Sequence, residues 1–138
     1  MPAYVQSSAQ LPITGLLPGG SQDVFSAEAV TTGERSQAVS LTNYPEGGAT
    51  PLSVDLVFNQ DPTAFKINVT FAAKDKAANY ACPDLTFQLT EANLDTASGG
   101  PNFTVHFECP FCNGRLVSLY VVSAPSAGGT TLTATLKR

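Results

Sequence analysis

Charged residues are scarce in this chain. Asp, Glu, Lys and Arg make up 13% of its 138 residues, roughly half the share of an ordinary soluble domain. Seven basic residues against eleven acidic ones give a formal charge of -4, so nothing attracts a phosphate backbone or an anionic bilayer. We therefore expect neither nucleic acid nor a membrane surface among its partners. The remaining polar surface, built from uncharged side chains, favours contact with neighbouring molecules.

Export signals and membrane spans are also missing. No basic residue precedes Arg35, and no apolar stretch has the length of a secretory signal or approaches the roughly 20 residues that span a bilayer. We expect the protein to be made and kept in a cytosol, or to be assembled there into something larger. Three cysteines in that compartment should be thiols or metal ligands rather than a disulfide framework.

Groups that could catalyse a reaction are few. His106 is the single histidine, so a Ser-His-Asp or Cys-His arrangement would have to use it. The carboxylates stand singly in turns and loops, without the pair that glycoside hydrolysis needs and without an Asp-x-Asp calcium loop. We expect no enzymatic activity and no cofactor.

What the chain does contain is a series of short strands. From Phe65 to Phe71, four large apolar residues occupy every second position, the pattern of a strand with one buried face. Further strands are expected at 23–31, 37–42, 53–58, 85–89, 103–107, 116–123 and 131–136. Because 116–123 is almost continuously apolar, it should lie in the middle of a sheet. The pattern is typical of a sandwich or barrel, and we predict an all-β, single-domain β-sandwich of jelly-roll or Ig-like type.

The first 22 residues show no such period and are rich in Pro, Gly, Ser and Gln. We predict an extended N-terminal arm at 1–22, followed by a sandwich domain at 23–138. Aliphatic residues between Pro and Gly suit a segment that packs on another subunit. The candidate anchors are Leu11, Ile13, Leu16 and Leu17.

The strongest local motif is the Cys-Pro-Phe-Cys-Asn-Gly turn from Cys109 to Gly114. It resembles one knuckle of a zinc ribbon, and a Cys3His zinc site would comprise Cys82, His106, Cys109 and Cys112. Strand parity opposes this set, because side chains three residues apart leave opposite faces. We therefore favour free structural cysteines and no metal, with a local disulfide and a zinc site as alternatives. A thioredoxin-type redox pair would need a helix that this turn between strands lacks.

Aromatic residues offer a second class of function. A sugar-binding platform would form if the four tyrosines, Tyr4, Tyr44, Tyr80 and Tyr120, converged on one sheet face. Packing in the core and at its rim is the commoner use of tyrosine in a sandwich. A carbohydrate-binding module is therefore the outside alternative.

Four segments carry a family resemblance. They are a strand at 53–58, a Pro-x-Ala-Phe-x-Ile-x-Val strand at 62–69, a Val-rich strand at 115–123 and a Thr-rich strand at 129–134. In this order they are similar to small virion proteins of tailed bacteriophages. The resemblance implies a virion protein assembled in the host cytoplasm, above all a capsid decoration or cement protein. Such a protein would bind the major capsid protein on the outer shell surface as a homotrimer. A tail-tube, head-completion or fibre-base protein would use the same fold.

Overall fold

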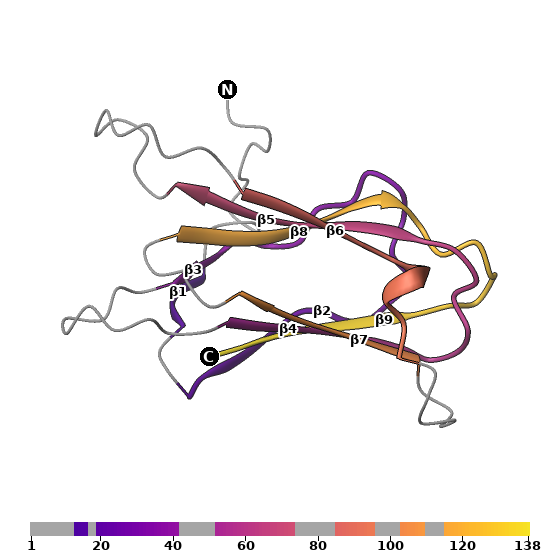
Figure 1. Ribbon diagram of the computed structural model, residues 1–138, viewed down its shortest axis with the longest axis horizontal. Helices are drawn as coiled ribbons and strands as arrows, with labels where there is room; N and C mark the ends of the chain where they lie inside the picture. The colour runs from indigo at the N-terminus through magenta and orange to yellow at the C-terminus, as the bar shows by residue number, and fades with distance from the viewer. Residues whose placement is uncertain (1–12, 17–18, 42–51, 74–84, 96–102, 110–114) are drawn as a thin grey trace.

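The computed structural model describes residues 13–16, 19–41, 52–73, 85–95, 103–109 and 115–138. These residues form two sheets that pack face to face, with one short 3-10 helix beside them (Figure 1). The predicted all-β sandwich is confirmed. Its elements are β1 (Ile13–Leu16), β2 (Ser21–Glu28), β3 (Val39–Leu41), β4 (Leu52–Phe58), β5 (Lys66–Ala73), β6 (Leu85–Thr90), η3 (Glu91–Asn93), β7 (Phe103–Cys109), β8 (Arg115–Ser123) and β9 (Leu132–Lys137).

The strand order identifies the type of sandwich. Sheet A has the order β1-β3-β8-β5-β6, and sheet B has the order β2-β9-β4-β7. The antiparallel pairs are nested in the sequence, because β2 pairs with β9, β3 with β8, β4 with β7 and β5 with β6. One long hairpin that folds over itself produces this nesting, and the result is a jelly roll. The topology therefore decides between the two sandwich types that the sequence left open.

Alternation along each strand builds the core between the sheets. In β4 the residues at even positions, from Leu52 to Phe58, are buried, while those between them are partly exposed. The ring centroids of Phe58 and Phe65 lie 4.7 Å apart in the interior. Burying a side chain of this size stabilises the fold by about 1.5 to 3 kcal/mol. β8 lies between β3 and β5, which confirms its predicted central position.

Part of the predicted arm belongs to the sandwich. β1 pairs in parallel with β3, with Ile13 opposite Val39, and the Leu16 side chain is 7% exposed within the core. β2 starts at Ser21, so the expected boundary between residues 22 and 23 falls inside a strand. The sequence did not reveal β1, because four residues flanked by Pro and Gly are too few to show the two-residue alternation of a strand. Two other predicted anchors, Leu11 and Leu17, lie outside the described residues.

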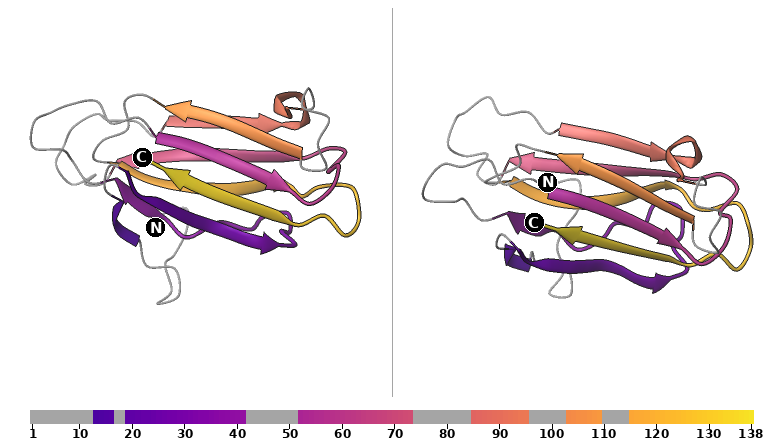
Figure 2. Two further views of the ribbon diagram at one scale, coloured as in Figure 1. Left: turned by 90° about the horizontal axis from the view of Figure 1, so that it is seen from below. Right: turned by 60° about the horizontal axis from the view of Figure 1, so that its bottom comes forward.

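The two sheets end on the same side of the sandwich at β6 and β7. Figure 2 shows these strands next to each other at one side of the molecule, with β1 and β2 at the other. The rings of Phe87 in β6 and Phe107 in β7 bridge the sheets with centroids 5.0 Å apart. This side is called the β6/β7 side below.

The helix η3 leads the chain from β6 toward β7. Thr90 caps it, because its hydroxyl accepts a hydrogen bond from Ala92 N at 3.3 Å while Asn93 Oδ1 accepts one from Thr90 N at 2.9 Å. This reciprocal capping box explains why a three-residue helix forms in a segment that shows no helical period. Two residues later, Asp95 N donates to the carbonyl of Thr104 in β7 at 2.7 Å.

Candidate functional site

Charged side chains gather on the outer face of sheet B. Asp55 in β4 stands directly opposite His106 in β7, and Asp55 Oδ1 lies 2.5 Å from His106 Nδ1. The other ring nitrogen, Nε2, lies 2.9 Å from Glu108 Oε1. Lys137 in β9 adds a contact of 3.3 Å between its Nζ and Asp55 Oδ2. The four residues form a chain of ion pairs across three strands.

The carboxylates determine the protonation of this histidine. Hydrogen bonds to Glu108 and then to Asp55 raise the pKa of His106 above its usual 6.5. The ion pairs of protonated His106 therefore stabilise the fold fully below pH 6.5. This stabilisation is lost as the pH rises through the raised pKa of His106. Because the His106 side chain is 56% exposed, solvent screens the effect and keeps it small.

This geometry limits the chemistry of His106. Both ring nitrogens donate to carboxylates when the ring is protonated, so neither has a lone pair for a metal ion or for a nucleophile's proton. A general base needs one free nitrogen that points at its target. We interpret the group as a surface ion-pair network that ties β4, β7 and β9 together.

Within the described residues, no three His, Cys, Asp or Glu side chains are placed to share a metal ion. His106 points to the outer face of β7, whereas Cys109 is buried, as the strand-parity argument predicted. Cys109 is disulfide-bonded, so the expectation of free cysteines is wrong for this residue, and its sulfur is not a thiolate that could bind zinc. Cys82 and Cys112 lie outside the described residues.

A second acidic group lies at the end of β2. Glu28 and Glu34 hydrogen-bond through their carboxyl groups, and this contact, with burial and charge repulsion, raises the pKa of Glu28 to about 7. Glu34 Oε1 also accepts a hydrogen bond of 3.0 Å from Thr31 N, which fixes the turn after β2. Glu28 Oε2 is shielded from solvent and accepts no hydrogen bond. The raised pKa favours the protonated form of Glu28 up to near neutral pH.

A bulge in β2 turns Glu28 into this position. The register with β9 changes between Phe25 and Glu28, so that Glu28 stands opposite the buried Leu132. Ala27 adopts a left-handed conformation with φ 47°, and its N–H donates to Thr133 Oγ1 at 3.0 Å. Without the extra residue, strict alternation would send the Glu28 carboxylate to the solvent.

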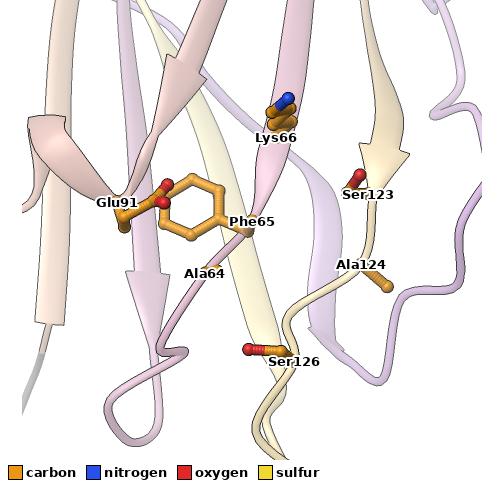
Figure 3. Close-up of a pocket in the computed structure, with 7 residues that line it drawn as sticks. All are labelled: Ala64, Phe65, Lys66, Glu91, Ser123, Ala124 and Ser126. Carbon is orange, nitrogen blue, oxygen red and sulfur yellow. The ribbon is translucent and has the colours of Figure 1, made fainter.

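A shallow pocket of about 190 Å³ lies where β5 begins and β8 ends. Figure 3 shows its residues coming from the start of β5 and the residues just before it, from η3, and from the end of β8 and the segment after it. They are Ala64, Phe65, Lys66, Glu91, Ser123, Ala124 and Ser126. Small-molecule sites usually measure about 300 to 1,000 Å³, so this pocket is too small for a typical cofactor.

Of the four tyrosines of the expected sugar-binding platform, the structure describes Tyr120. Tyr120 on β8 is half-buried, and the guanidinium of Arg35 covers its ring at 4.8 Å from the centroid. A sugar would have to displace this cation to stack on the ring. Tyr4, Tyr44 and Tyr80 lie outside the described residues.

The β6/β7 side carries the exposed apolar surface of the described residues. Leu85 and Phe87 in β6 are each 37% exposed, and they are the large hydrophobic residues that remain open to solvent there. Sequence analysis missed this surface because the alternation of β6 looks like that of any half-buried strand. Its place at a sheet edge becomes visible once the strand order is known.

Comparisons with protein-family models, with curated proteins and with solved structures found no match. Among the described residues, no helix is long and apolar enough to cross a membrane.

Proposed function

We propose that this protein is a non-enzymatic structural protein of a tailed-bacteriophage particle, specifically a decoration or cement protein. It binds the major capsid protein on the outer surface of the shell and stabilises the assembled lattice. The proposal starts from the sequence resemblance. The fold and the side-chain chemistry of the described residues support it.

The observation that carries the proposal is where the resembling segments fall in the fold. Segments 53–58 and 129–134 contribute β4 and β9, and segments 62–69 and 115–123 contribute β5 and β8. All four are interior strands of their sheets. The resemblance therefore covers the framework of the jelly roll rather than scattered positions. A framework alone permits several functions, which is why position in a particle is the deciding measurement.

The side-chain chemistry supports a binding role over a catalytic one. The His106 ring is engaged by two carboxylates, and the pocket beside Lys66 and Glu91 is small. Charges gather on the outer face of sheet B, whereas the outward positions of β5 and β6 in sheet A are mostly short uncharged polar side chains, namely Asn68, Thr70, Thr86 and Gln88. Such a surface is suited to close packing against a neighbouring protein, since little charge has to be desolvated.

Cementing works by mass action. A protein that binds the assembled lattice but not the free subunits stabilises the lattice by its binding free energy at every site. A homo-oligomer gains more, because its second contact forms at the high effective concentration that the first one creates. This mechanism needs no cofactor and no chemical step.

The shell contact is assigned to the chain that precedes β1. Ile13 and Leu16 are committed to the sandwich, where β1 pairs with β3, so Leu11 is the remaining aliphatic anchor before the first strand. Deletion of residues 2–10 with Leu11→Ser should abolish binding to purified shells, while circular dichroism and melting temperature stay unchanged. A matched control, Gln10→Ser in the full chain, should bind normally. Undiminished shell occupancy by the deletion variant would contradict this assignment.

The position of the chain in particles tests the function itself. An averaged cryo-electron microscopy map of the virion should show many copies on the capsid exterior at symmetry-related positions. A few copies at the tail or at the portal vertex would instead identify a tail-tube, head-completion or fibre-base protein. Absence from every particle would refute the virion role.

A further inference from the structure

The outer edge of β6 differs from the other sheet edges. β6 pairs with β5 on one side, and no described strand pairs with its other side. Its six residues, Leu85–Thr90, carry no charge. An exposed edge offers unpaired backbone N–H and C=O groups to any strand that approaches. Proteins usually protect such edges with charges, bulges or covering segments.

The edges on the far side of the sandwich have that protection. At β1, the Arg138 guanidinium donates to the carbonyl of Leu16 at 2.6 Å. At β2, the register shifts twice, and the strand carries Asp23 and Glu28. An approaching strand would meet a cation at the edge of β1. At the edge of β2 it would meet an irregular backbone and acidic side chains.

The neighbouring edge, β7, is also blocked. The backbone N–H of Asp95 donates a hydrogen bond of 2.7 Å to the carbonyl of Thr104, and the two residues form an isolated β-bridge. His106 and Glu108 place charges on the same strand. Of the four edge strands among the described residues, β6 alone has no charged residue and no described side chain or segment bound to its open edge.

The side chains of β6 also have unused apolar surface. Leu85 and Phe87 stand opposite Phe71 and Val69 of β5, both fully buried, so they belong to the inner face of sheet A. They nevertheless remain 37% exposed, because the sandwich ends there. A strand added beside β6 would extend the sheet and cover them, as in recognition by β-strand addition.

We propose that a second copy of this chain covers the β6/β7 side, with β6 pairing antiparallel to β6 of the second copy about a two-fold axis. A two-fold contact sets each surface against itself, so a charge would meet its own copy. The neutrality of β6 removes this penalty in a chain whose formal charge is -4. The electrostatics thus favour this strand over the charged edges for self-association.

The alternation of β6 gives the expected register. With Phe87 opposite Phe87 of the second copy, Leu85 faces Leu89 and Thr86 faces Gln88. Apolar residues then meet on the inner face, and uncharged polar residues meet on the outer face. The two five-stranded sheets become one continuous sheet across the dimer. This inference concerns the purified protein, goes beyond the virion role, and puts a two-fold dimer in place of the homotrimer that the resemblance implies.

Two double variants that differ at one residue test the pairing. Thr86→Lys with Gln88→Lys sets lysines opposite lysines across the axis, whereas Thr86→Lys with Gln88→Glu sets each lysine opposite a glutamate. Thr86 and Gln88 are exposed, so the fold should survive, and melting temperatures at low concentration check this. Molar mass by light scattering and dissociation constants by sedimentation velocity are measured in the purified full-length protein.

The unmodified chain should have the mass of a dimer. The Lys/Lys variant should weaken the dimer about tenfold or more, and the Lys/Glu variant should restore it. Ser26→Lys, an added charge on exposed β2, should have no effect. A monomer at every concentration, a trimer, or a dimer equally insensitive to both double variants would overturn the proposal. None of these results depends on whether the chain occurs in a virion.

Discussion

At the scale of single residues, the least ordinary group is the carboxyl pair of Glu28 and Glu34. An acid with a raised pKa binds its proton more tightly in the folded chain than in the unfolded one. Between the usual 4.5 and about 7 for Glu28, the folded state therefore holds more protons. Stability must fall as the pH rises through this window, because the folded chain loses the proton of Glu28 and leaves a partly buried carboxylate beside Glu34.

Glu28→Gln tests this sign. The variant should unfold at a higher temperature than the unmodified chain at pH 8 and at nearly the same temperature at pH 5. We expect a gain of about 1 kcal/mol at the higher pH, discounted for partial exposure of the pair. Glu91→Gln, which removes one exposed carboxylate from η3, is the matched control for the change in net charge. A gain that is equal at both pH values would argue against a raised pKa of Glu28 as its cause.

At the scale of elements, irregularities in strands and turns decide where acidic residues such as Glu28 and Asp95 are placed. The bulge in β2 turns Glu28 inward, and the capping box of η3 brings Asp95 onto the edge of β7. Neither feature follows from the period of the sequence. Each arises from a backbone conformation, such as the left-handed Ala27, which a residue with a Cβ adopts at a cost of about 1 to 2 kcal/mol.

Ala27→Gly should therefore stabilise the protein. Glycine adopts a positive φ without the clash of Cβ, and Ala27 is exposed, so little packing is lost. After subtraction of the greater freedom of glycine in the unfolded chain, we expect a gain of about 0.5 to 1 kcal/mol in urea denaturation. Ser26→Gly is the matched control, since Ser26 has no positive φ; it should destabilise. A loss of stability in both variants would show that the bulge is not strained.

At the scale of the whole molecule, the disulfide at Cys109 constrains the unfolded chain as well as the folded one. Cys109 ends β7 and is 7% exposed. A cross-link to Cys82 would close a much longer loop than one to Cys112, and longer loops lose more entropy on closure. The identity of the partner therefore sets how much the bond stabilises the sandwich.

With three cysteines in the chain and one bond, the denatured oxidised protein should expose a single thiol. Reduction should lower the free energy of unfolding by about 2 to 4 kcal/mol, toward the lower value for a short loop. Thiol titration and peptide mapping without reductant measure the count and the partner. Three reactive thiols before reduction would show that the bond does not form.

The sequence by itself determined the local features of this protein. Strand positions such as 53–58 and 116–123 and the sandwich class follow from alternation, because a side chain's face depends on its immediate neighbours in the strand. The same rule placed His106 and Cys109 on opposite faces of β7. These properties need no knowledge of what each strand pairs with.

The tertiary structure alone decided the rest. The nested strand order, the burial of Leu16, the ion pairs of His106 with Asp55 and the open edge at β6 all depend on contacts between segments far apart in the chain. Many registers satisfy the same alternation, and the choice among them is made by the packing of the entire core. The charged network and the uncovered edge belong to this second category.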